Sequence, residues 1–463
     1  MNPVAVVGGG ITGLTAAFYL TRSGMPVTVY EKSGRTGGSI RSVLDQGFLT
    51  EDGPSQITET AEVAALIEDL QLEARRLYPN SDAQARFIVR GGRPLEAPAS
   101  PFGLISTKLF SAAAKWRILA EPFIGRSDAA REESVAEFVR RRLGAEMLDY
   151  AVDPLVSGIF AGDPNRLSLR CAFPKLHELE QMGGSLTAGA LASMFKRKNG
   201  APRAHTTRKR GRERALFSFD TGCQVLPDTL AARLGAAIRL SARVSGIAKS
   251  AHGWEITSTS GGREESNAHS AVLLTAPAYE LAGLAVRTQD SLSLSALKEI
   301  VYPPIVRVTL GFRKDQFPKP IRGFGFLVPG KEPFHVLGTI FASCAYPGRA
   351  PLGHVNLSSY LGGMRNPAIT ALSEGDIIAA TLADYRTLLG VKGDPVFHSH
   401  RFIARAIPQY TIGYGRYTQW MWESEQSMPG LFFAGNYRDG ISVANSIGSA
   451  VRAAERIAKS LNG

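Results

Sequence analysis

Three glycines near the beginning of the chain have the spacing of a phosphate-binding turn. Gly8, Gly10 and Gly13 form Gly-x-Gly-x-x-Gly directly after an apolar run at residues 4–7, which is typical of a buried parallel strand. Gly8 permits a tight turn, Gly10 lets a pyrophosphate approach the backbone, and Gly13 lets the following helix pack closely on the strand. The free amides at the start of that helix, which includes residues 14–20, would bind phosphate oxygens.

A carboxylate follows the next predicted strand. Residues 27–30 favour a strand, and Glu31 comes eighteen residues after Gly13. At that place a carboxylate accepts hydrogen bonds from the adenosine ribose, and its charge repels a 2′-phosphate. Strand, turn, helix and carboxylate together predict a dinucleotide site rather than an ordinary glycine-rich turn.

The segments that follow decide between a nicotinamide and a flavin. Residues 35–41 form a second small, cationic turn, and residues 431–443 form a further strand, glycine turn and helix start. A flavin dinucleotide is long enough to touch these segments and the turn at residues 51–55, and no second Gly-x-Gly-x-x-Gly is present for a nicotinamide nucleotide. We therefore expect FAD. The expected FAD contacts are Gly8, Gly9, Gly10, Ile11, Thr12, Gly13, Glu31, Lys32, Arg35, Gly38, Ser39, Arg41, Gly53, Pro54, Ser55, Gln56, Val244, Gly435, Ile441, Ser442 and Val443.

Composition limits the class of protein. With 463 residues, 44% of them hydrophobic, the chain is expected to fold into two or three globular domains. Its three cysteines are scattered, which argues against a disulfide framework, a zinc site or an iron–sulfur site and favours a reducing compartment. We expect a cytoplasmic protein without a leader segment, because the first predicted strand begins almost at the first residue. The uncharged stretch at residues 181–195 is too short to span a bilayer.

Positive charge is concentrated in one segment. Residues 196–214 contain nine Lys or Arg against Glu213 alone, which gives +8 of the formal net charge of +12. This segment has no periodicity and is expected to be a solvated surface connector. An alternative is attraction to anionic lipid headgroups or to a carboxylate-rich substrate. Nucleic-acid binding ranks last, because aromatic residues are not interleaved with the cations.

The predicted organisation is an α/β fold with a discontinuous Rossmann-type FAD-binding domain. Residues 1–84, 222–279 and 427–463 would form this domain, and residues 85–95 and 280–426 a substrate domain with a mainly antiparallel sheet. Residues 96–190 would form an inserted helical domain, and residues 191–221 a basic linker with a further substrate-domain segment. Within the helical domain, residues 107–123 are amphipathic, which is typical of a surface helix that packs on a core or contacts a membrane.

Longer stretches of the sequence resemble one enzyme family. They are residues 157–174 (Ser-Gly-Ile-Phe-Ala-Gly-Asp-Pro-Asn-Arg-Leu-Ser-Leu-Arg-Cys-Ala-Phe-Pro), 323–329, 337–343, 360–363 and 407–413. In these stretches, which follow the family's order over nearly the whole chain, the sequence resembles the FAD-dependent, oxygen-using protoporphyrinogen IX oxidases of the amine-oxidase-like flavoprotein superfamily. A covalent flavin would need a cysteine near the C-terminal glycine turn, and none follows Cys344, so the resemblance implies non-covalent FAD.

The resemblance implies a tetrapyrrole held between apolar faces. Leu327 and Ile340 would sandwich the macrocycle, and Tyr360 would stack on a pyrrole ring where the family often has phenylalanine. Gly158 would lie where backbone approaches the ring. Arg86 would pair with a propionate, because a guanidinium binds a carboxylate through two hydrogen bonds.

The implied reaction is the six-electron oxidation of protoporphyrinogen IX to protoporphyrin IX in haem biosynthesis. In each two-electron step a methylene bridge gives a hydride to N5 of FAD, and O2 reoxidises the flavin and yields H2O2. The cofactor carries the chemistry, so the protein has to position the substrate and exclude water. No Ser/His/Asp, Cys/His or paired-carboxylate arrangement stands out, and we assign neither a catalytic residue nor a metal ligand.

Alternatives stay open at this point. Oxidation of coproporphyrinogen III would need more cations in the pocket, and the positive net charge of the chain favours this reaction. The sequence of residues 435–443 instead resembles the protoporphyrinogen branch. A more distant alternative is a flavin- and porphyrin-binding protein without turnover. Ser55 stands where some family members have arginine, which puts a second cationic contact there in doubt. The partners considered are the porphyrinogen, O2, the inner face of the cell membrane, ferrochelatase as recipient of the product, and a second copy of the chain.

Overall fold

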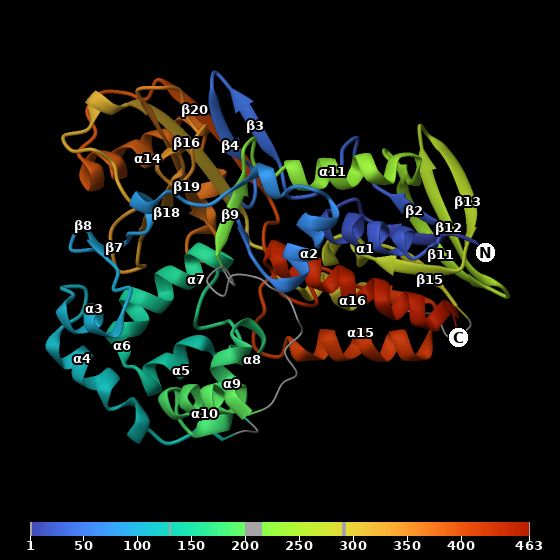
Figure 1. The fold of residues 1–463 in the computed structure, drawn as a ribbon, viewed down its shortest axis with the longest axis horizontal. Coiled ribbons are helices and arrows are strands. Elements are labelled where there is room, and N and C mark those ends of the chain that lie inside the picture. Colours follow the sequence, from blue (N-terminus) through green and yellow to red (C-terminus); the bar gives the residue numbers. More distant parts are fainter. Residues whose placement is uncertain (1, 129–130, 200–214, 289–292, 463) are drawn as a thin grey trace.

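The computed structural model describes residues 2–128, 131–199, 215–288 and 293–462. Figure 1 shows a five-stranded sheet with its helices on one side of the molecule, a seven-stranded sheet at the other side, and a group of helices below the latter. The α/β fold class is confirmed. Most of the basic segment, residues 200–214, lies outside the described residues.

A parallel five-stranded sheet brings together distant parts of the chain. Its strand order is β10 (Ile238–Arg239), β2 (Val27–Tyr30), β1 (Val4–Val7), β14 (Ala271–Leu274) and β21 (Leu431–Phe433), and all four pairings are parallel. Strands β1, β14 and β21 are short and buried on both faces, which explains their continuous apolar sequences. The predicted discontinuous Rossmann-type sheet is therefore present.

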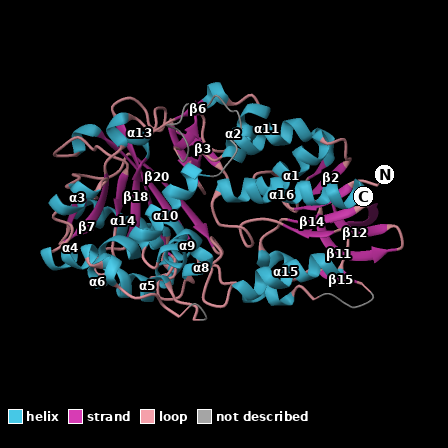
Figure 2. Cartoon of the chain, turned by 60° about the horizontal axis from the view of Figure 1, so that its bottom comes forward, coloured by secondary structure: helices cyan, strands magenta, loops and turns pink. Residues whose placement is uncertain are grey.

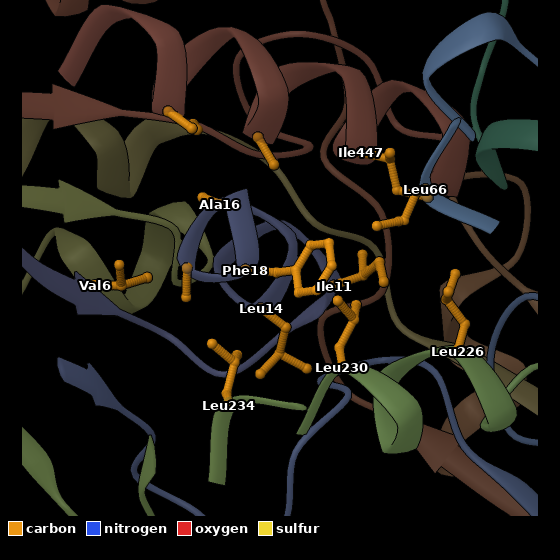
Figure 3. Packing of buried hydrophobic residues seen from close by; sticks show 14 of the residues in the cluster. Val6, Ile11, Leu14, Ala16, Phe18, Leu66, Leu226, Leu230, Leu234 and Ile447 are labelled. Carbon is orange, nitrogen blue, oxygen red and sulfur yellow. The ribbon is translucent and has the colours of Figure 1, made fainter. Parts of the chain in front are cut away.

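Helices cover one face of this sheet. They are α1 (Ile11–Arg22), α2 (Ala61–Asp69), α11 (Val225–Leu234) and α16 (Val443–Asn462). Figure 3 shows Leu14 and Phe18 of α1 beside Leu230 of α11 and Ile447 of α16 in one core cluster. Because Leu14 and Ile447 are fully buried, the last helix of the chain is fixed against the first.

A second, smaller sheet covers the opposite face. Its order is β13 (Arg263–His269), β12 (Gly253–Ser260), β11 (Arg243–Ser250) and β15 (Ala285–Arg287). Trp254 and Ile256 of β12 pack against Ala5 and Val272 of the parallel sheet. Helices α12 (Ala278–Leu281) and α15 (Gly415–Ser427) complete this layer.

The third large element is a seven-stranded sheet. Its order is β20 (Phe397–Ile403), β16 (Ile305–Arg313), β19 (His354–Gly362), β18 (Val336–Phe341), β17 (Gly325–Leu327), β7 (Arg86–Arg90) and β8 (Arg93–Glu96). Only the β7–β17 pairing is parallel among these described strands, so the sheet is mainly antiparallel, as predicted. Helix α14 (Glu374–Leu389) buries Tyr385 and Leu388 against one face.

Short helices form the remaining region, which Figures 1 and 2 show on one side of the seven-stranded sheet. They are α3 (Pro101–Ser106), α4 (Ala112–Leu119), α5 (Val135–Arg142), α6 (Ala145–Met147), α7 (Asp153–Phe160), α8 (Leu169–Ala172), α9 (Pro174–Gly183) and α10 (Leu186–Asn199). Helix α5 begins with a capping box between Ser134 and Glu137, which satisfies its first amides. Among the described helices, none combines the length and apolar character needed to cross a bilayer.

Small sheets join these regions, and two of the predicted domain assignments differ from the observed pairing. Strands β3 (Ser42–Asp45) and β4 (Phe48–Glu51) form a hairpin, and β9 (Leu216–Phe219) pairs with β5 (Ile57–Thr58) and β6 (Arg76–Leu77). Strand β9 therefore joins the first part of the chain, because Phe217 and Phe219 are buried in the core beside α1 and α2, and not the substrate domain. Likewise, β15 pairs with β11 and not with the seven-stranded sheet. The other predicted domain boundaries stay predictions.

Candidate active site

The first glycine turn connects β1 to the N-terminus of α1. Gly8 has φ +116°, and a Cβ on Gly13 would lie 2.0 Å from the carbonyl oxygen of Gly8. Both positions therefore need glycine, for conformation and for space respectively. Gly10 precedes α1, and no side chain caps this helix, so its first amides are available to an anion. Ile11 and Thr12 form the first turn of the helix.

Glu31 lies against this turn at the end of β2. Its carboxylate accepts hydrogen bonds from the amide of Gly9 (2.7 Å) and from the amide and hydroxyl of Ser33 (2.8 and 2.7 Å). A Cβ on Gly9 would come within 2.9 Å of the Glu31 side chain, so carboxylate and turn are in direct contact. Val244 is buried in β11, close to where the amide of Ala242 binds the carbonyl of Glu31.

The second glycine turn packs on the first. The amide of Gly37 donates to the carbonyl of Gly9 (2.8 Å), and a Cβ on Gly38 would lie 3.1 Å from the Cα of Gly10. Arg35 donates to the carbonyl oxygens of Gly38 (2.5 Å) and Ile40 (3.2 Å), which holds the turn closed. Lys32, expected at the cofactor, has its ammonium 2.7 Å from the carboxylate of Glu280.

The turn at residues 51–56 continues this series of contacts. The amide of Asp52 donates to the carbonyl of Arg41 (2.8 Å), and a Cβ on Gly53 would lie 2.0 Å from the carbonyl oxygen of Ser39. Gln56 accepts a hydrogen bond from Tyr346 (3.3 Å). Pro54 and Ser55, which lie between Gly53 and Gln56 in the chain, are half-buried.

The C-terminal glycine turn reaches the same place from the other end of the chain. Gly435 has φ +132°, and a Cβ there would lie 3.8 Å from the hydroxyl of Thr12. Ile441 and Ser442 precede α16, which begins at Val443, and the hydroxyl of Ser442 accepts from the amide of Asn445 (3.0 Å). The structure thus brings the first, second and C-terminal turns together. Lys32 instead forms an ion pair with Glu280.

These features fit FAD. The crowded glycines leave bare backbone at the start of a twelve-residue helix, and Glu31 lies beside it at the end of the next strand. An uncapped helix N-terminus suits the pyrophosphate, and a carboxylate at the end of β2 suits the adenosine ribose. These residues would hold the pyrophosphate and the adenosine ribose of FAD.

The residues predicted to hold a tetrapyrrole lie on one face of the seven-stranded sheet. In the strand register, Leu327 is opposite Gly338 and Gly338 is opposite Tyr360, while Ile340 is opposite Gly325 two positions further along. Directly paired residues share a sheet face, so Leu327, Tyr360 and Ile340 line the same surface. Arg86 begins β7 opposite Gly325, in the row of Ile340.

Gly158 reaches this surface from α7. A Cβ on Gly158 would lie 2.6 Å from Cδ2 of Leu327, so the helix backbone and the leucine side chain are in contact. All five predicted substrate residues are therefore brought to one region of the molecule. The side chain of Arg86 is exposed and lies over the ring of Phe324, 5.4 Å from its centroid.

Tyr360 links this surface to the cofactor turns. Its hydroxyl donates to the carbonyl of Gly53 at 3.5 Å. Burial raises the pKa of Tyr360 to about 12, and the nearby Arg307 guanidinium acts in the opposite direction. The hydroxyl therefore stays protonated near neutral pH and can act as a hydrogen-bond donor.

Sequence reasoning missed several residues at this junction. Arg307, 1% exposed, donates to Asp52 (2.9 Å) and Ser399 (3.0 Å), which joins the seven-stranded sheet to the turn that contains Gly53. Arg307 is the only charged residue in the apolar run at residues 305–310, and a charge within a predicted buried strand could have indicated a functional residue. Tyr410 was also missed: its hydroxyl accepts from the amide of Gly440 (2.9 Å), and its carbonyl accepts from Ser168 (2.8 Å).

Comparisons with known proteins agree with this arrangement. The family model described as flavin-containing amine oxidoreductase matches residues 11–458. The chain is 36% identical over 475 residues to protoporphyrinogen oxidase 2, chloroplastic/mitochondrial, of Arabidopsis thaliana, covering 98% of this chain and 93% of that protein. It is 28% identical over 460 residues to coproporphyrinogen III oxidase of Bacillus subtilis, covering 96% and 95%.

A solved structure has the same architecture. A protein described as a protoporphyrinogen oxidase from Exiguobacterium superposes with a TM-score of 0.80 at 25% identity, covering 100% of this chain and 99% of that one. With the cofactor turns assembled at the end of the parallel sheet, these likenesses settle the family. The chain belongs to the flavin-containing amine oxidoreductases and, within them, to the family of the protoporphyrinogen oxidases, and it is an FAD-dependent oxidoreductase.

Proposed function

We propose that this protein oxidises protoporphyrinogen IX to protoporphyrin IX with O2 as the electron acceptor, as a step of haem biosynthesis. The observation that carries the proposal is the register of the seven-stranded sheet, which places Leu327, Ile340 and Tyr360 on one face beside the Gly53 turn. The similarity to relatives named protoporphyrinogen oxidase supports it.

The chain's own residues bind, orient and shield the substrate. The apolar side chains of Leu327 and Ile340 offer a surface to the macrocycle, and the phenol ring of Tyr360 offers a stacking partner. Arg86, which makes no ion pair with any described residue, is available to a propionate. The three glycine turns and Glu31 would hold FAD, which would supply hydride acceptance at N5 and electron transfer to O2. Exclusion of water and fixed orientation are the protein's contribution to the rate.

Anaerobic mixing of the FAD-loaded protein with protoporphyrinogen IX tests this proposal. We expect the oxidised flavin absorbance to bleach, and porphyrin fluorescence and H2O2 to appear together when O2 is admitted. Porphyrin binding without bleaching or H2O2 would instead support the non-catalytic alternative.

We also propose a peripheral contact with the inner face of the cell membrane through α4 and the turn after it. Leu109 and Phe110 are buried, but Trp116, Leu119 and Phe123 are 72%, 60% and 89% exposed. Exposed aromatic and aliphatic side chains grouped in this way suit the interface region of a bilayer. Transfer of the product to ferrochelatase and a homodimer stay predictions.

Vesicle sedimentation tests the membrane contact. The double variant Trp116→Ser and Phe123→Ser is expected to pellet less with anionic phospholipid vesicles than the unchanged chain, because each substitution removes apolar area that membrane contact would bury. Leu352→Ser is the matched control, since Leu352 is 99% exposed but lies just before β19 of the seven-stranded sheet, outside the helical region. Equal sedimentation of all three proteins would contradict the proposal.

A further inference from the structure

Residues 407–413 follow β20 and precede α15, and their backbone is hydrogen-bonded on two sides. The amide of Gln409 donates to the carbonyl of Val301, shortly before β16 (2.9 Å). The amide of Ser168, just before α8, donates to the carbonyl of Tyr410 (2.8 Å). Gln409 and Tyr410 are 1% and 4% exposed. This segment therefore has a fixed place between the seven-stranded sheet and the helical region.

The side chain of Gln409 completes the end of α7. The carbonyl of Phe160 would ordinarily accept from the amide four positions later, but that residue is Pro164, which has no amide proton. Nε2 of Gln409 donates to this carbonyl instead (2.8 Å), and also to the carbonyl of Ile407 (3.1 Å). Gly158, which reaches the tetrapyrrole surface, stands two positions before Phe160. Gln409 thus helps to determine where the substrate-facing helix lies.

Backbone strain follows directly after this hydrogen bond. Ala161 has φ +49°, a left-handed conformation that is unfavourable for a residue with a Cβ. Its carbonyl accepts from the amide of Met364 (2.8 Å), which comes two residues after β19. Strained residues persist where the surrounding structure holds them, and they are common at functional sites. The end of α7 is therefore held in one position relative to the strand that carries Tyr360.

The amide of Gln409 is present at a cost in stability. Among the residues that the structure describes, Oε1 of Gln409 has no hydrogen-bond partner. A buried acceptor without a partner is unfavourable, whereas an apolar side chain of the same length would avoid that penalty. An unpaired group of this kind in a native structure needs a reason other than stability. Donation by Nε2 to the end of α7 supplies such a reason.

The next residue reaches the cofactor side. The hydroxyl of Tyr410 donates to the carbonyl of Asn436 and accepts from the amide of Gly440 (2.9 Å). Both partners belong to the C-terminal glycine turn that contains Gly435 and precedes α16. Burial raises the pKa of Tyr410, so the hydroxyl keeps the proton that it donates. Two neighbouring side chains therefore hold the substrate-facing helix and a cofactor turn.

We propose that Gln409 and Tyr410 are positioning residues that together set the spacing between the bound tetrapyrrole and FAD. The proposal rests on the proposed function and deepens it. Gln409 acts through α7 and Tyr410 through the C-terminal turn, so neither side chain has to touch the substrate. Reacting atoms must come within about 3–3.5 Å, and a small displacement lowers the rate far more than it weakens binding. Loss of either hydrogen bond should therefore slow flavin reduction while FAD and porphyrin stay bound.

Anaerobic reduction of bound FAD by protoporphyrinogen IX, followed as flavin bleaching, tests the role of Gln409. Gln409→Met keeps the length and removes the donor, and is expected to slow bleaching roughly tenfold or more. The Kd of protoporphyrin IX and the Tm should stay the same, because the variant exchanges one unpaired acceptor for another. Slower bleaching that is matched by a lower Tm would indicate a merely structural role and overturn the proposal.

Gln316→Met is the matched control. Gln316 is 8% exposed, and its Nε2 donates to the carbonyls of Lys392 (2.9 Å) and Asp394 (2.8 Å), after α14 and beyond the far end of β16. The same chemical change is therefore made away from the tetrapyrrole surface. The control is expected to lower the Tm and to bleach at the rate of the unchanged chain. Equal slowing in Gln316→Met and Gln409→Met would contradict the proposal.

Gln409→Glu provides a rescue that depends on pH. A protonated carboxyl can donate to the carbonyl of Phe160, and an ionised one cannot. Because burial raises the pKa of a carboxyl, the variant should bleach at nearly the rate of the unchanged chain at low pH. Its rate relative to the unchanged chain should then fall as the pH rises, while that of Gln409→Met stays constant. A constant ratio for both variants would show that donation to α7 is not what matters.

Tyr410→Phe removes only the hydroxyl and tests the cofactor side. It is expected to slow bleaching with the flavin content after gel filtration unchanged. Since both side chains fix the same spacing, the double variant with Gln409→Met should be little slower than the slower single variant. A rate reduced by the product of the two single factors would reveal two independent roles. That result would overturn the proposal, as would slowing that merely follows loss of bound FAD.

The excited-state lifetime of the flavin with protoporphyrin IX bound reports the spacing without turnover, because electron-transfer quenching falls steeply with distance. The lifetime should lengthen in Gln409→Met and Tyr410→Phe and stay the same in Gln316→Met. Equal lifetimes in all variants would overturn the proposal. If the unchanged chain bound porphyrin but its flavin never bleached, the proposed function would be wrong, and the lifetimes would still decide whether these residues position the two molecules.

Discussion

At the residue scale, Gly13 illustrates how little space the cofactor turn leaves. A Cβ at this position would lie 2.0 Å from the carbonyl of Gly8 and 2.8 Å from the hydroxyl of Thr275, so backbone would have to move. We predict that Gly13→Ala weakens FAD binding roughly tenfold or more, because overpacking of this kind costs about 1–3 kcal/mol. Flavin absorbance retained after gel filtration measures the effect. Gly34→Ala is the control, since its Cβ would meet only a serine hydroxyl at 3.9 Å; equal flavin loss in both variants would contradict the prediction.

A buried carboxyl next to the same turns makes stability depend on pH. Burial raises the pKa of Glu51 from 4.5 to about 7, while hydrogen bonds from Ser42 and Cys223 and the charge of Arg349 act in the opposite direction and Asp52 reinforces the rise. Between about pH 4.5 and pH 7 the Glu51 carboxyl is therefore protonated in the folded state and ionised in the unfolded state. The corresponding stability is fully present below about pH 4.5 and is lost as the pH rises through about 7.

We accordingly predict that Glu51→Gln flattens the pH dependence of unfolding. Over that interval the free energy of unfolding of the unchanged chain should fall relative to the variant by on the order of 2–3 kcal/mol. Thermal melts of both proteins across the interval provide the measurement. Parallel curves for the two proteins would show that Glu51 does not titrate there.

The residues that could be predicted from sequence are those with local signatures. Gly13 and Glu31 stand at fixed distances from one strand and one helix, and the structure places them in one turn. Arg307 could not be placed in the same way, because its partner Asp52 is 255 residues away in the chain and the contact depends on strand register. Lys32 carries the right charge for a phosphate, but its long side chain can reach several nearby carboxylates. It pairs with Glu280, which is distant in the sequence and could not be predicted from a local pattern.

At the scale of elements, strands were easier to predict than their pairing. The alternation of residue types at residues 306–310, 336–341 and 355–360 lies within β16, β18 and β19, since successive side chains of a strand point to opposite faces of its sheet. The bulge between Val336 and Gly338 in β18 has no comparable signal, yet it decides that Gly338, and not its neighbour, is opposite Tyr360. The face that carries the substrate residues is set by that bulge.

Buried charges join the elements of the helical region. Arg142 of α5 is fully buried and contacts Glu180 of α9 (2.5 Å) and Glu121 (3.0 Å), and Glu121 also accepts from the amide of Leu186 at the start of α10 (2.8 Å). Removing the cation would leave the buried Glu121 without its ion pair and would leave Glu180 paired with Arg141 alone (3.0 Å). We predict that Arg142→Met destabilises this region by about 3–5 kcal/mol.

Limited proteolysis and thermal unfolding of the variant provide the measurement. Arg131→Met is the matched control, because Arg131 pairs with Glu137 at the surface, where an ion pair contributes about 0–1 kcal/mol. Similar protease resistance of the two variants would mean that packing alone holds α5, α9 and α10 together.

At the scale of the whole molecule, the cofactor site depends on segments from the entire chain. Strands β1, β14 and β21 lie side by side, although β1 and β21 are separated by more than four hundred residues in the chain, and α16 is buried against α1. A ligand that contacts the turns after β1 and β21 must therefore oppose separation of the two chain ends. Ligand binding to the folded state alone adds about 2.7 kcal/mol at a hundredfold excess over Kd.

This linkage predicts which half of the cofactor matters most. Glu31 and the first glycine turn suit the adenosine ribose and the pyrophosphate, so FAD should raise the Tm of the stripped protein by a few degrees and ADP should reproduce part of that rise. FMN, which lacks the adenosine half, should raise it little. A thermal shift titration with the three nucleotides measures this order, and in Glu31→Ala the rise with ADP should shrink more than the residual rise with FMN. An FMN effect equal to that of FAD would show that the turn around Gly8 to Gly13 does not anchor the nucleotide, and the assembly of the chain ends would then need another explanation.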